Sequence, residues 1–186
     1  MTDGTPLEMP WSHPVAVKDL NGRKPLRFDI SPEPALRKEI AQWADIVSVE
    51  ALSFKGELTP AGKHDFVLNG KLHARITQSC VITLEPVAGE VKESVSRRFL
   101  RDWVEPTAEE SEIPEDDSAE ALPAVIDLAH VALEAFELGL PLYPRKDGAE
   151  LGETVITKPG ETPLRDEDLK PFANLKALMD KKDGNA

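Results

Sequence analysis

The chain has 186 residues, 40% of them hydrophobic and only 5% aromatic, which fits one modest core of aliphatic side chains. The formal net charge of -12 argues against nucleic-acid binding over the whole surface, because phosphate binding depends on Lys and Arg. The single cysteine, Cys80, excludes an internal disulfide and a cysteine-rich zinc cluster, and no run approaches the roughly 18 apolar residues of a membrane-spanning helix. We therefore expect one domain over residues 1–186, not exported and located in the cytoplasm, with no metal or other cofactor.

The first predicted element is a short amphipathic helix over residues 32–44. Ser31 fits an N-cap and Pro32 a first helical residue. Apolar residues then recur at helical spacing, at Leu36, Ile40 and Trp43. Beyond the helix the period changes to two, and the apolar positions switch from odd to even numbers near residue 50. This phase slip predicts a β-bulge.

Residues 66–84 show the clearest alternation in the chain. Eight apolar residues share even numbers: Phe66, Leu68, Leu72, Ala74, Ile76, Cys80, Ile82 and Leu84. This predicts a half-buried antiparallel strand. A straight strand of this length would span roughly 60 Å, so we expect a bend or break at Gly70 or near Gln78 and Ser79. The predicted fold is α+β: a curved antiparallel sheet or partly open barrel with a few short amphipathic helices and long mobile loops.

Residues 90–103 fit either a strand or a drifting helical stripe, and we favour the strand. Residues 64–104 would then form the centre of the sheet. The ordered body is predicted to cover about 12–104 and 122–144.

Residues 105–120 contain eight acids and no base, and without them the net charge would be -4. We interpret this tract as a mobile linker. A helix follows, with Asp127 as its N-cap and Gly139 at its end, and its predicted inner face is Leu128, Val131, Ala132, Ala135 and Leu138. Residues 145–170 are predicted to be a flexible loop and residues 171–181 a C-terminal helix.

The sequence shows no established catalytic motif. His130 and Glu134 have the spacing of two metal ligands on one helix face, but two ligands without a third favour a surface pair. His64, Asp65 and His73 fall on the polar side of the predicted strand, where side chains face solvent, and Cys80 falls on the apolar side as a small inert core residue. We therefore expect a protein that is not an enzyme.

One basic cluster stands out, formed by Lys92, Arg97, Arg98 and Arg101 with Phe99 and Trp103 interleaved. Arginine suits phosphate and aromatic rings can stack on unpaired bases, so RNA contact is one interpretation. A solvated or salt-bridged face is the other. Strand alternation places Arg98 opposite to Arg97 and Arg101, so the three share a ligand only at an edge or bend.

Three passages carry a resemblance to a known family: LNGKLHARITQSCVITLEPV (68–87), VIDLAHVALEAFELGLPLYP (125–144) and PFANLKAL (171–178). They resemble the YceD family of large ribosomal RNA subunit accumulation proteins. They are similar in order to the family's glycine-bearing strand, C-x-x-C-L-x-P-like turn, L-x-L-P-x-x-P element and terminal P-F-x-x-L-x-x-L. The family-motif positions are Gly70, Cys80, Leu84, Pro86, Pro141 and Pro144, which we interpret first as bend, core and turn positions.

The resemblance implies a non-catalytic accessory factor in accumulation of 23S ribosomal RNA and assembly of the large subunit. Its partner would be large-subunit ribosomal RNA, its precursor, or a large-subunit ribosomal protein. The chain departs from the family at Thr83, which takes the place of the second cysteine, so a metal or redox site of other members is not expected. The alternative function is an acidic interaction module that captures a basic ribosomal protein without touching RNA.

Overall fold

The computed structural model describes residues 9–20, 24–103, 119–150 and 152. The chain divides into two units, Met1–Asp147 and Gly148–Ala186, and nearly all of the second lies outside the described residues. The elements are β1 (Pro14–Ala16), the 3-10 helix η1 (Val17–Asp19), β2 (Leu26–Ile30), α1 (Pro34–Trp43), β3 (Ser48–Ala61), β4 (Asp65–Ser79), β5 (Pro86–Leu100), β6 (Ala119–Ala121), β7 (Val125–Asp127) and α2 (Leu128–Leu138).

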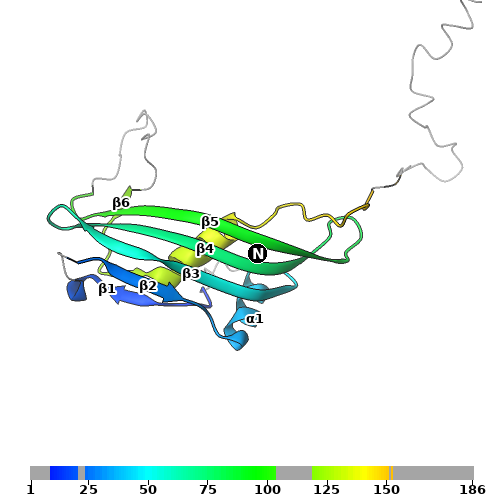
Figure 1. The fold of residues 1–186 in the computed structure, drawn as a ribbon, viewed down its shortest axis with the longest axis horizontal. Helices are drawn as coiled ribbons and strands as arrows, with labels where there is room; N and C mark the ends of the chain where they lie inside the picture. The colour runs from blue at the N-terminus through cyan, green and yellow to red at the C-terminus, as the bar shows by residue number, and fades with distance from the viewer. Residues whose placement is uncertain (1–8, 21–23, 104–118, 151, 153–186) are drawn as a thin grey trace, which may run out of the picture. The chain divides into compact units, whose positions relative to one another are not determined.

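A five-stranded sheet in the order β2-β3-β4-β5-β6 forms the frame of the first unit (Figure 1). Its strands are antiparallel except β6, which runs parallel to β5. A separate two-stranded sheet joins β1 to β7, which leads directly into α2. The main sheet is twisted and open, so the predicted α+β fold is confirmed, with no closed barrel among the described strands.

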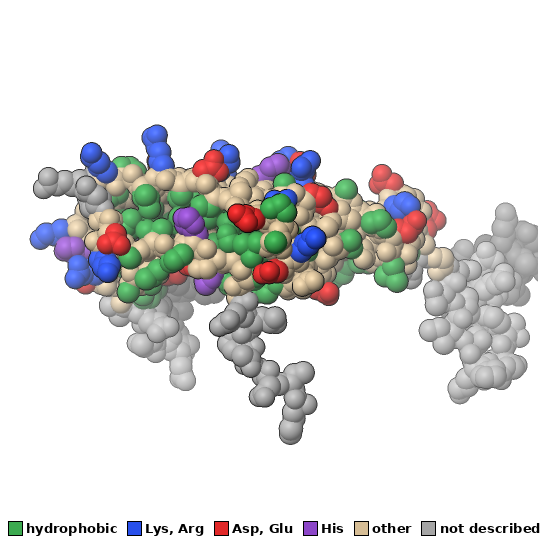
Figure 2. Space-filling model, turned by 90° about the horizontal axis from the view of Figure 1, so that it is seen from below, with side chains coloured by type: hydrophobic (Ala, Val, Ile, Leu, Met, Phe, Trp, Pro, Cys, Tyr) green, Lys and Arg blue, Asp and Glu red, His purple; other side chains and the backbone are tan. Residues whose placement is uncertain are grey.

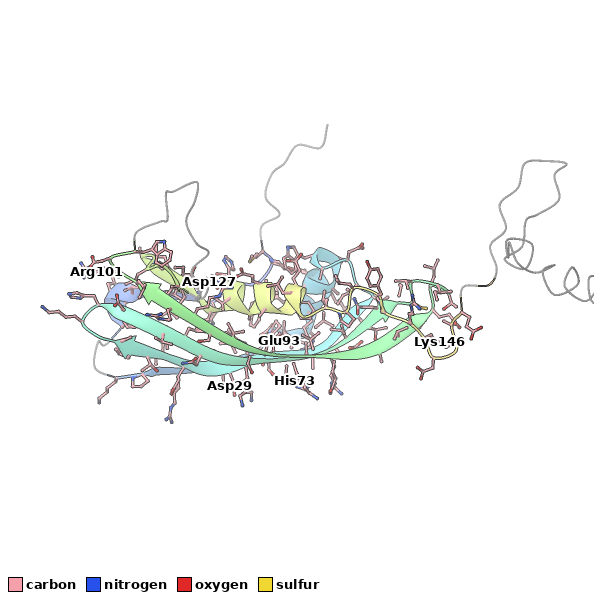
Figure 3. All side chains as sticks on the ribbon, turned by 90° about the horizontal axis from the view of Figure 1, so that it is seen from above. Asp29, His73, Glu93, Arg101, Asp127 and Lys146 are labelled. Carbon is pink, nitrogen blue, oxygen red and sulfur yellow. The ribbon has the colours of Figure 1, made fainter. Side chains whose placement is uncertain are left out.

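The hydrophobic core lies on one face of this sheet. Phe54, Leu68 and Ile76 point from β3 and β4 toward the helices and are almost fully buried, as are Ile40 of α1 and Phe136 of α2. Both helices lie on this same side (Figure 3). Among the described residues, no helix lies against the other face of the sheet, which agrees with the alternation of apolar and polar residues along β4.

The two predicted helices are present with corrected details. α1 begins at Pro34 with Glu33 at its N-cap, so the predicted cap Ser31 and first residue Pro32 are wrong. Pro32 and Pro34 both suit the first turn of a helix, and the prediction chose Pro32 as the first helical residue instead of Pro34. Asp127 caps α2 as predicted, by accepting from the amides of two residues in its first turn.

The buried face of α2 is wider than predicted. It includes Ala129, Leu133 and Phe136, whereas Leu138 is 81% exposed. A helix that packs against a sheet on one side and a second small sheet on another buries more than a narrow stripe. No described helix has the length and apolar character needed to cross a membrane.

The strand predictions are confirmed in most respects. The bulge lies between Val49 and Ala51, and residues 86–100 form a strand. β4 ends at Ser79, which confirms the break near Gln78 and Ser79 and excludes one at Gly70. Leu84 lies in the following turn with φ of 60° and 77% exposure, so its predicted inward position is wrong.

The predicted acidic linker is shorter than proposed, because Ala119–Ala121 form β6 against β5. The rest of the tract, residues 105–118, lies outside the described residues, as do the predicted C-terminal helix 171–181 and most of the loop 145–170. The mobile linker, the flexible loop and the C-terminal helix therefore stay predictions from the sequence.

Gly70 is required by a close approach inside the sheet. A Cβ at this position would lie 2.4 Å from the ring of Phe54, which fills the space beneath it. The ring in turn packs against Phe28, with 5.0 Å between centroids. The family-motif glycine therefore has a packing role.

Candidate functional site

The predicted basic cluster does not form one site. Alternation along β5 places Arg97 on the helix side and Lys92 and Arg98 on the open face, while Arg101 follows the end of the strand. The predicted separation of Arg98 from Arg97 is confirmed. A single ligand therefore cannot use all four side chains from one surface.

Arg97 is held by carboxylates on the helix side. Its Nη2 lies 2.7 Å from Glu134 Oε2, and its Nη1 lies 3.4 Å from Glu120 Oε1. Burial by itself would lower the pKa of Arg97, but the hydrogen bond and charge of Glu134, followed by those of Glu120, raise it. Arg97 thus ties β5 to α2 and β6, which is the salt-bridged alternative considered for the cluster.

Arg101 lies at the end of the sheet beside a groove of about 920 Å³, here called the end groove. The basic lining comes from Lys18, Lys63, His64 and Arg101, and the rest is mostly apolar. Lys, Arg and His side chains gather at this end of the body in Figure 2. The Arg101 amide donates to Asp65 at 2.9 Å, which fixes the backbone at the groove edge. His64 and Asp65 therefore shape this end and do not converge as an acid-base pair.

The open face of the sheet carries a set of basic residues that we call the basic stripe. It consists of Lys71, His73 and Arg75 on β4 and Lys92 and Arg98 on β5, all pointing away from the helices. His73 and Asp29 project from this face, whereas Glu93 lies on the helix side (Figure 3). Outward positions of β4 and β5 hold four Lys or Arg and two acids, Asp65 and Glu90. The stripe is therefore positive on an acidic chain.

The neighbouring strands do not add to this charge. On β2 and β3, Arg27 lies 3.7 Å from Glu57 and Lys55 Nζ lies 3.0 Å from Asp29. Glu50, at the bulge, adds another acid whose pKa is lowered: burial raises it, but hydrogen bonds from Ser48 and Thr77 outweigh that effect. The positive surplus is thus confined to the β4–β5 half of the open face.

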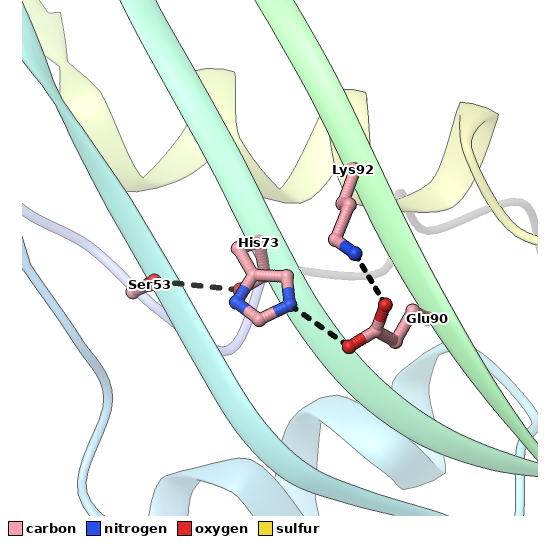
Figure 4. A network of polar contacts seen from close by, with 4 residues as sticks. All are labelled: Ser53, His73, Glu90 and Lys92. Carbon is pink, nitrogen blue, oxygen red and sulfur yellow. Dashed lines mark hydrogen bonds and ion pairs between the residues drawn. The ribbon is translucent and has the colours of Figure 1, made fainter.

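One carboxylate neutralises part of the stripe (Figure 4). Glu90 Oε2 lies 2.5 Å from Lys92 Nζ, and Oε1 lies 3.4 Å from His73 Nε2. The hydrogen bond from Lys92, followed by that from His73, lowers the pKa of Glu90. Lys71 and Arg75 make no ion pair with any residue that the structure describes. The charge of Arg75 does contribute to the lowered pKa of Glu50, so Lys71 is the less compensated of the two.

A shallow hollow of about 440 Å³ lies in the same face. Its lining combines Lys71 with the neutral hydrogen-bonding groups of Asn69, Ser94 and Ser96. Lys55 and Glu57 also line it, and these two are paired with Asp29 and Arg27 of β2. The stripe runs from the row of Val67 and Arg98 to the row of Arg75 and Glu90, a distance of about 27 Å at 3.4 Å per residue. This surface can bind a row of anionic groups through charge and hydrogen bonds.

The family-motif residues other than Gly70 lie at the opposite end of β4. The turn after Ser79 binds the segment beyond α2: Val81 N donates to Pro144 O at 2.9 Å, and Gln78 Nε2 donates to Pro141 O at 3.1 Å. Lys146 Nζ lies 2.9 Å from Glu85 Oε1. The motif positions therefore join two distant passages, and we call this region the motif turn.

Cys80 is the centre of the motif turn. Its Sγ accepts from the amides of Lys146 at 3.4 Å and of Ile82 and Thr83 at 3.5 Å, and its side chain is fully buried. The predicted burial is confirmed. The Thr83 side chain, followed by the Lys146 and Thr83 amides, lowers the pKa of Cys80 to about 6. The residue that replaces the second cysteine thus contributes a hydrogen bond to the first.

The motif turn also exposes apolar side chains. Leu84 is 77%, Leu142 84% and Tyr143 76% exposed. Pro86 begins β5 on this side of the turn. Of the motif positions, Leu84 is thus a surface residue and not a core residue.

The His130 and Glu134 pair is separated by its partners. His130 Nε2 lies 3.7 Å from Asp127 Oδ2, while Glu134 binds Arg97. Among the described residues, no three His, Cys, Asp or Glu side chains come together as a metal-binding group.

A family model described as "Large ribosomal RNA subunit accumulation protein YceD" matches residues 68–179, more than half of the chain. The chain belongs to the YceD family. The match covers β4, β5, α2 and the motif turn, so the resemblance seen in the sequence is confirmed. No curated protein and no solved structure matches the chain.

The residues that sequence reasoning missed are Lys71 and Arg75. Both lie on the polar side of the YceD-family strand, with His73 between them, and were interpreted as ordinary solvent-facing positions. The alternation of polar and apolar residues showed that Lys71 and Arg75 face outward. It could not show the register in which β5 pairs with β4. Lys92 and Arg98 join them only through that pairing.

Proposed function

We propose that this protein is a non-catalytic accessory factor in accumulation of 23S ribosomal RNA, acting in the cytoplasm by direct contact with the RNA or its precursor. Family membership supports the link to large-subunit ribosomal RNA. The basic stripe is the observation that carries the proposal of direct contact, because it places Lys71 and Arg75, free of ion pairs with described residues, on a helix-free sheet face.

The open face is one of two basic regions of the described body, the other being the end groove, and we favour it because its cations lie in rows along two paired strands. The chain carries -12 overall, so a local surplus of cations on an exposed surface attracts phosphate where most of the protein repels it. Arg97 takes no part, since Glu120 and Glu134 hold it on the other side. A binding role that uses preformed surface charge needs no catalytic groups.

In-cell crosslinking tests the proposal. Tagged wild-type protein is crosslinked to RNA, and the recovered RNA is sequenced and compared with that from a Lys71→Glu/Arg75→Glu variant. We expect large-subunit ribosomal RNA to dominate the wild-type sample and to be depleted in the variant. Equal recovery by both proteins would contradict contact through the stripe.

A second candidate function is capture of a ribosomal protein before it joins the RNA. The exposed Leu84, Leu142 and Tyr143 at the motif turn favour a protein partner, as does the acidity of residues 105–118. Replacing the acids of 105–118 with Gln and Asn keeps the length of the connection between the parallel strands β5 and β6. It should weaken capture of a basic protein, while RNA binding should strengthen as repulsion falls. Unchanged capture would argue against this candidate.

A further inference from the structure

We infer that the open face recognises the backbone of helical RNA and not unpaired bases. This inference rests on the proposed function and names the form of RNA that the basic stripe accepts. It follows from three properties of the described face: its missing aromatics, its neutral hydrogen-bonding groups and its length.

The outward positions of β2, β3, β4 and β5 include no Phe, Tyr or Trp. Sheets that bind single strands use aromatic side chains as stacking platforms for the bases. The one ring on the stripe, His73, is held beside Glu90 in the network of Figure 4. All aromatic side chains of β2–β5 instead point to the helix side, as Phe54 and Phe99 do in the core. This face therefore offers unpaired bases almost nothing to stack on.

Neutral donors and acceptors lie between the cations. Asn69 pairs with Ser96 across β4 and β5, and Lys71 pairs with Ser94, so hydroxyl and amide groups sit in the rows between Arg75 and Arg98. Helical RNA presents phosphates and 2′-hydroxyls along its shallow groove, and those groups are read by charge and small polar side chains. The composition of the stripe matches that chemistry.

The stripe is also long enough for several contacts. At about 27 Å it extends past more than one phosphate along a helix, whose charge is dense at about one per 1.7 Å in a duplex. A single strand carries half that line density, and without stacking it gains no compensating contact. We therefore expect tighter binding to the helix than to the single strand.

Binding of three probes to full-length protein tests the inference by fluorescence anisotropy: an RNA hairpin with a stem of about 16 base pairs, one strand of that stem alone, and the matching DNA duplex. We expect the hairpin to bind most tightly, with a log–log salt slope of about -2 to -4. The Lys71→Gln/Arg75→Gln variant should bind about 60-fold more weakly at 0.1 M salt, and its slope should be shallower by about 1.8, at about 0.9 for each phosphate contact.

A Lys38→Gln/Arg145→Gln variant is the matched control. It removes the same charge from two exposed residues away from the open face, in α1 and beyond α2, and should bind like wild type. Single-strand binding equal to hairpin binding, sensitive to the Lys71 and Arg75 changes, would overturn this inference and leave the proposed function standing. Binding of no RNA probe would overturn both, and equal loss in the control would overturn the assignment to the stripe.

Discussion

Asp127 joins the N-terminal segment to α2, and its replacement is the sharpest test of the fold. Its carboxylate accepts from the Ser12 hydroxyl at 2.5 Å and the His13 amide at 2.8 Å, and from the amides of Ala129 at 3.0 Å and His130 at 3.2 Å. Asp127→Ala removes the helix cap, worth about 1 kcal/mol, and the two bonds to the N-terminal segment, worth about 1 kcal/mol more at this partly exposed site. We expect the free energy of unfolding to fall by about 2 kcal/mol.

Urea unfolding followed by tryptophan fluorescence measures the change, and Trp11, one of the three tryptophans, is buried beside this network. Asp127→Asn keeps an oxygen acceptor for the helix amides but not the charge, so it should cost less than Asp127→Ala. Asp147→Ala, an exposed acid in the same unit, is the control and should stay within about 0.5 kcal/mol of wild type. A loss below about 0.5 kcal/mol for Asp127→Ala would refute the reasoning.

The pH dependence of the same measurement separates charge from shape. Burial raises the pKa of Asp127, but hydrogen bonds from the His13 amide and the Ser12 hydroxyl outweigh burial and lower it overall. A carboxyl with a lowered folded pKa stabilises the protein fully above its unfolded pKa of about 3.9 and ceases to do so as the pH falls through the folded pKa. The stability gap between wild type and Asp127→Asn should therefore close on acidification below about pH 4. A gap that widened there would contradict the assignment.

Gly70→Ala should destabilise the fold by about 1–3 kcal/mol, because its Cβ would meet the ring of Phe54, whereas Gly89→Ala should cost less since its nearest neighbour lies 3.5 Å away; equal melting temperatures for the two variants would contradict this. Cys80 should react with a thiol reagent only after denaturation, because it is fully buried, and fast labelling of native protein would disprove it. The lowered pKa of Cys80, about 6, predicts that wild type gains stability over Cys80→Ala as the pH rises from 6 to 9, and a constant difference in urea midpoints would count against it. Arg97→Gln should lower stability by about 0.5–1 kcal/mol and leave RNA affinity unchanged, so a selective loss of RNA binding would show that its assignment to the helix side is wrong.

The fold could be predicted where one physical rule acts locally. The even-numbered apolar residues of β4 fixed its buried face, and the side chain of Asp127 with the apolar run after it marked the start of α2. The phase slip near Val49 likewise identified the bulge. Each of these signals depends on residues close together in the chain.

The open face could be predicted only in part, because its charge depends on strand register. The sequence placed Arg97, Arg98 and Arg101 together, whereas the pairing of β4 with β5 sets Arg98 and Lys92 beside Lys71 and Arg75. Arg97 instead forms ion pairs with carboxylates on β6 and α2, which lie 23 and 37 positions away in the sequence and so could not be predicted as its partners.

The motif turn shows the same limit. The even number of Cys80 placed it among the apolar residues of the strand and predicted an inert core thiol. The sequence could not show that amides of Ile82, Thr83 and Lys146 would converge on its sulfur. Leu84 continued the even-numbered series but lies past the end of β4, where alternation no longer decides which side chains are buried. Contacts between the turn and residues beyond α2 depend on the assembled fold.

The most direct test of RNA contact measures the ratio of large-subunit to small-subunit ribosomal RNA in cells. The strain lacks the gene and is complemented with one form of the protein at a time. We expect wild type and Lys38→Gln/Arg145→Gln to restore the ratio. Lys71→Glu/Arg75→Glu, produced at the same level and equally folded, should leave the ratio as low as in the deletion strain. Full restoration by Lys71→Glu/Arg75→Glu would contradict the claim that the basic stripe holds the RNA.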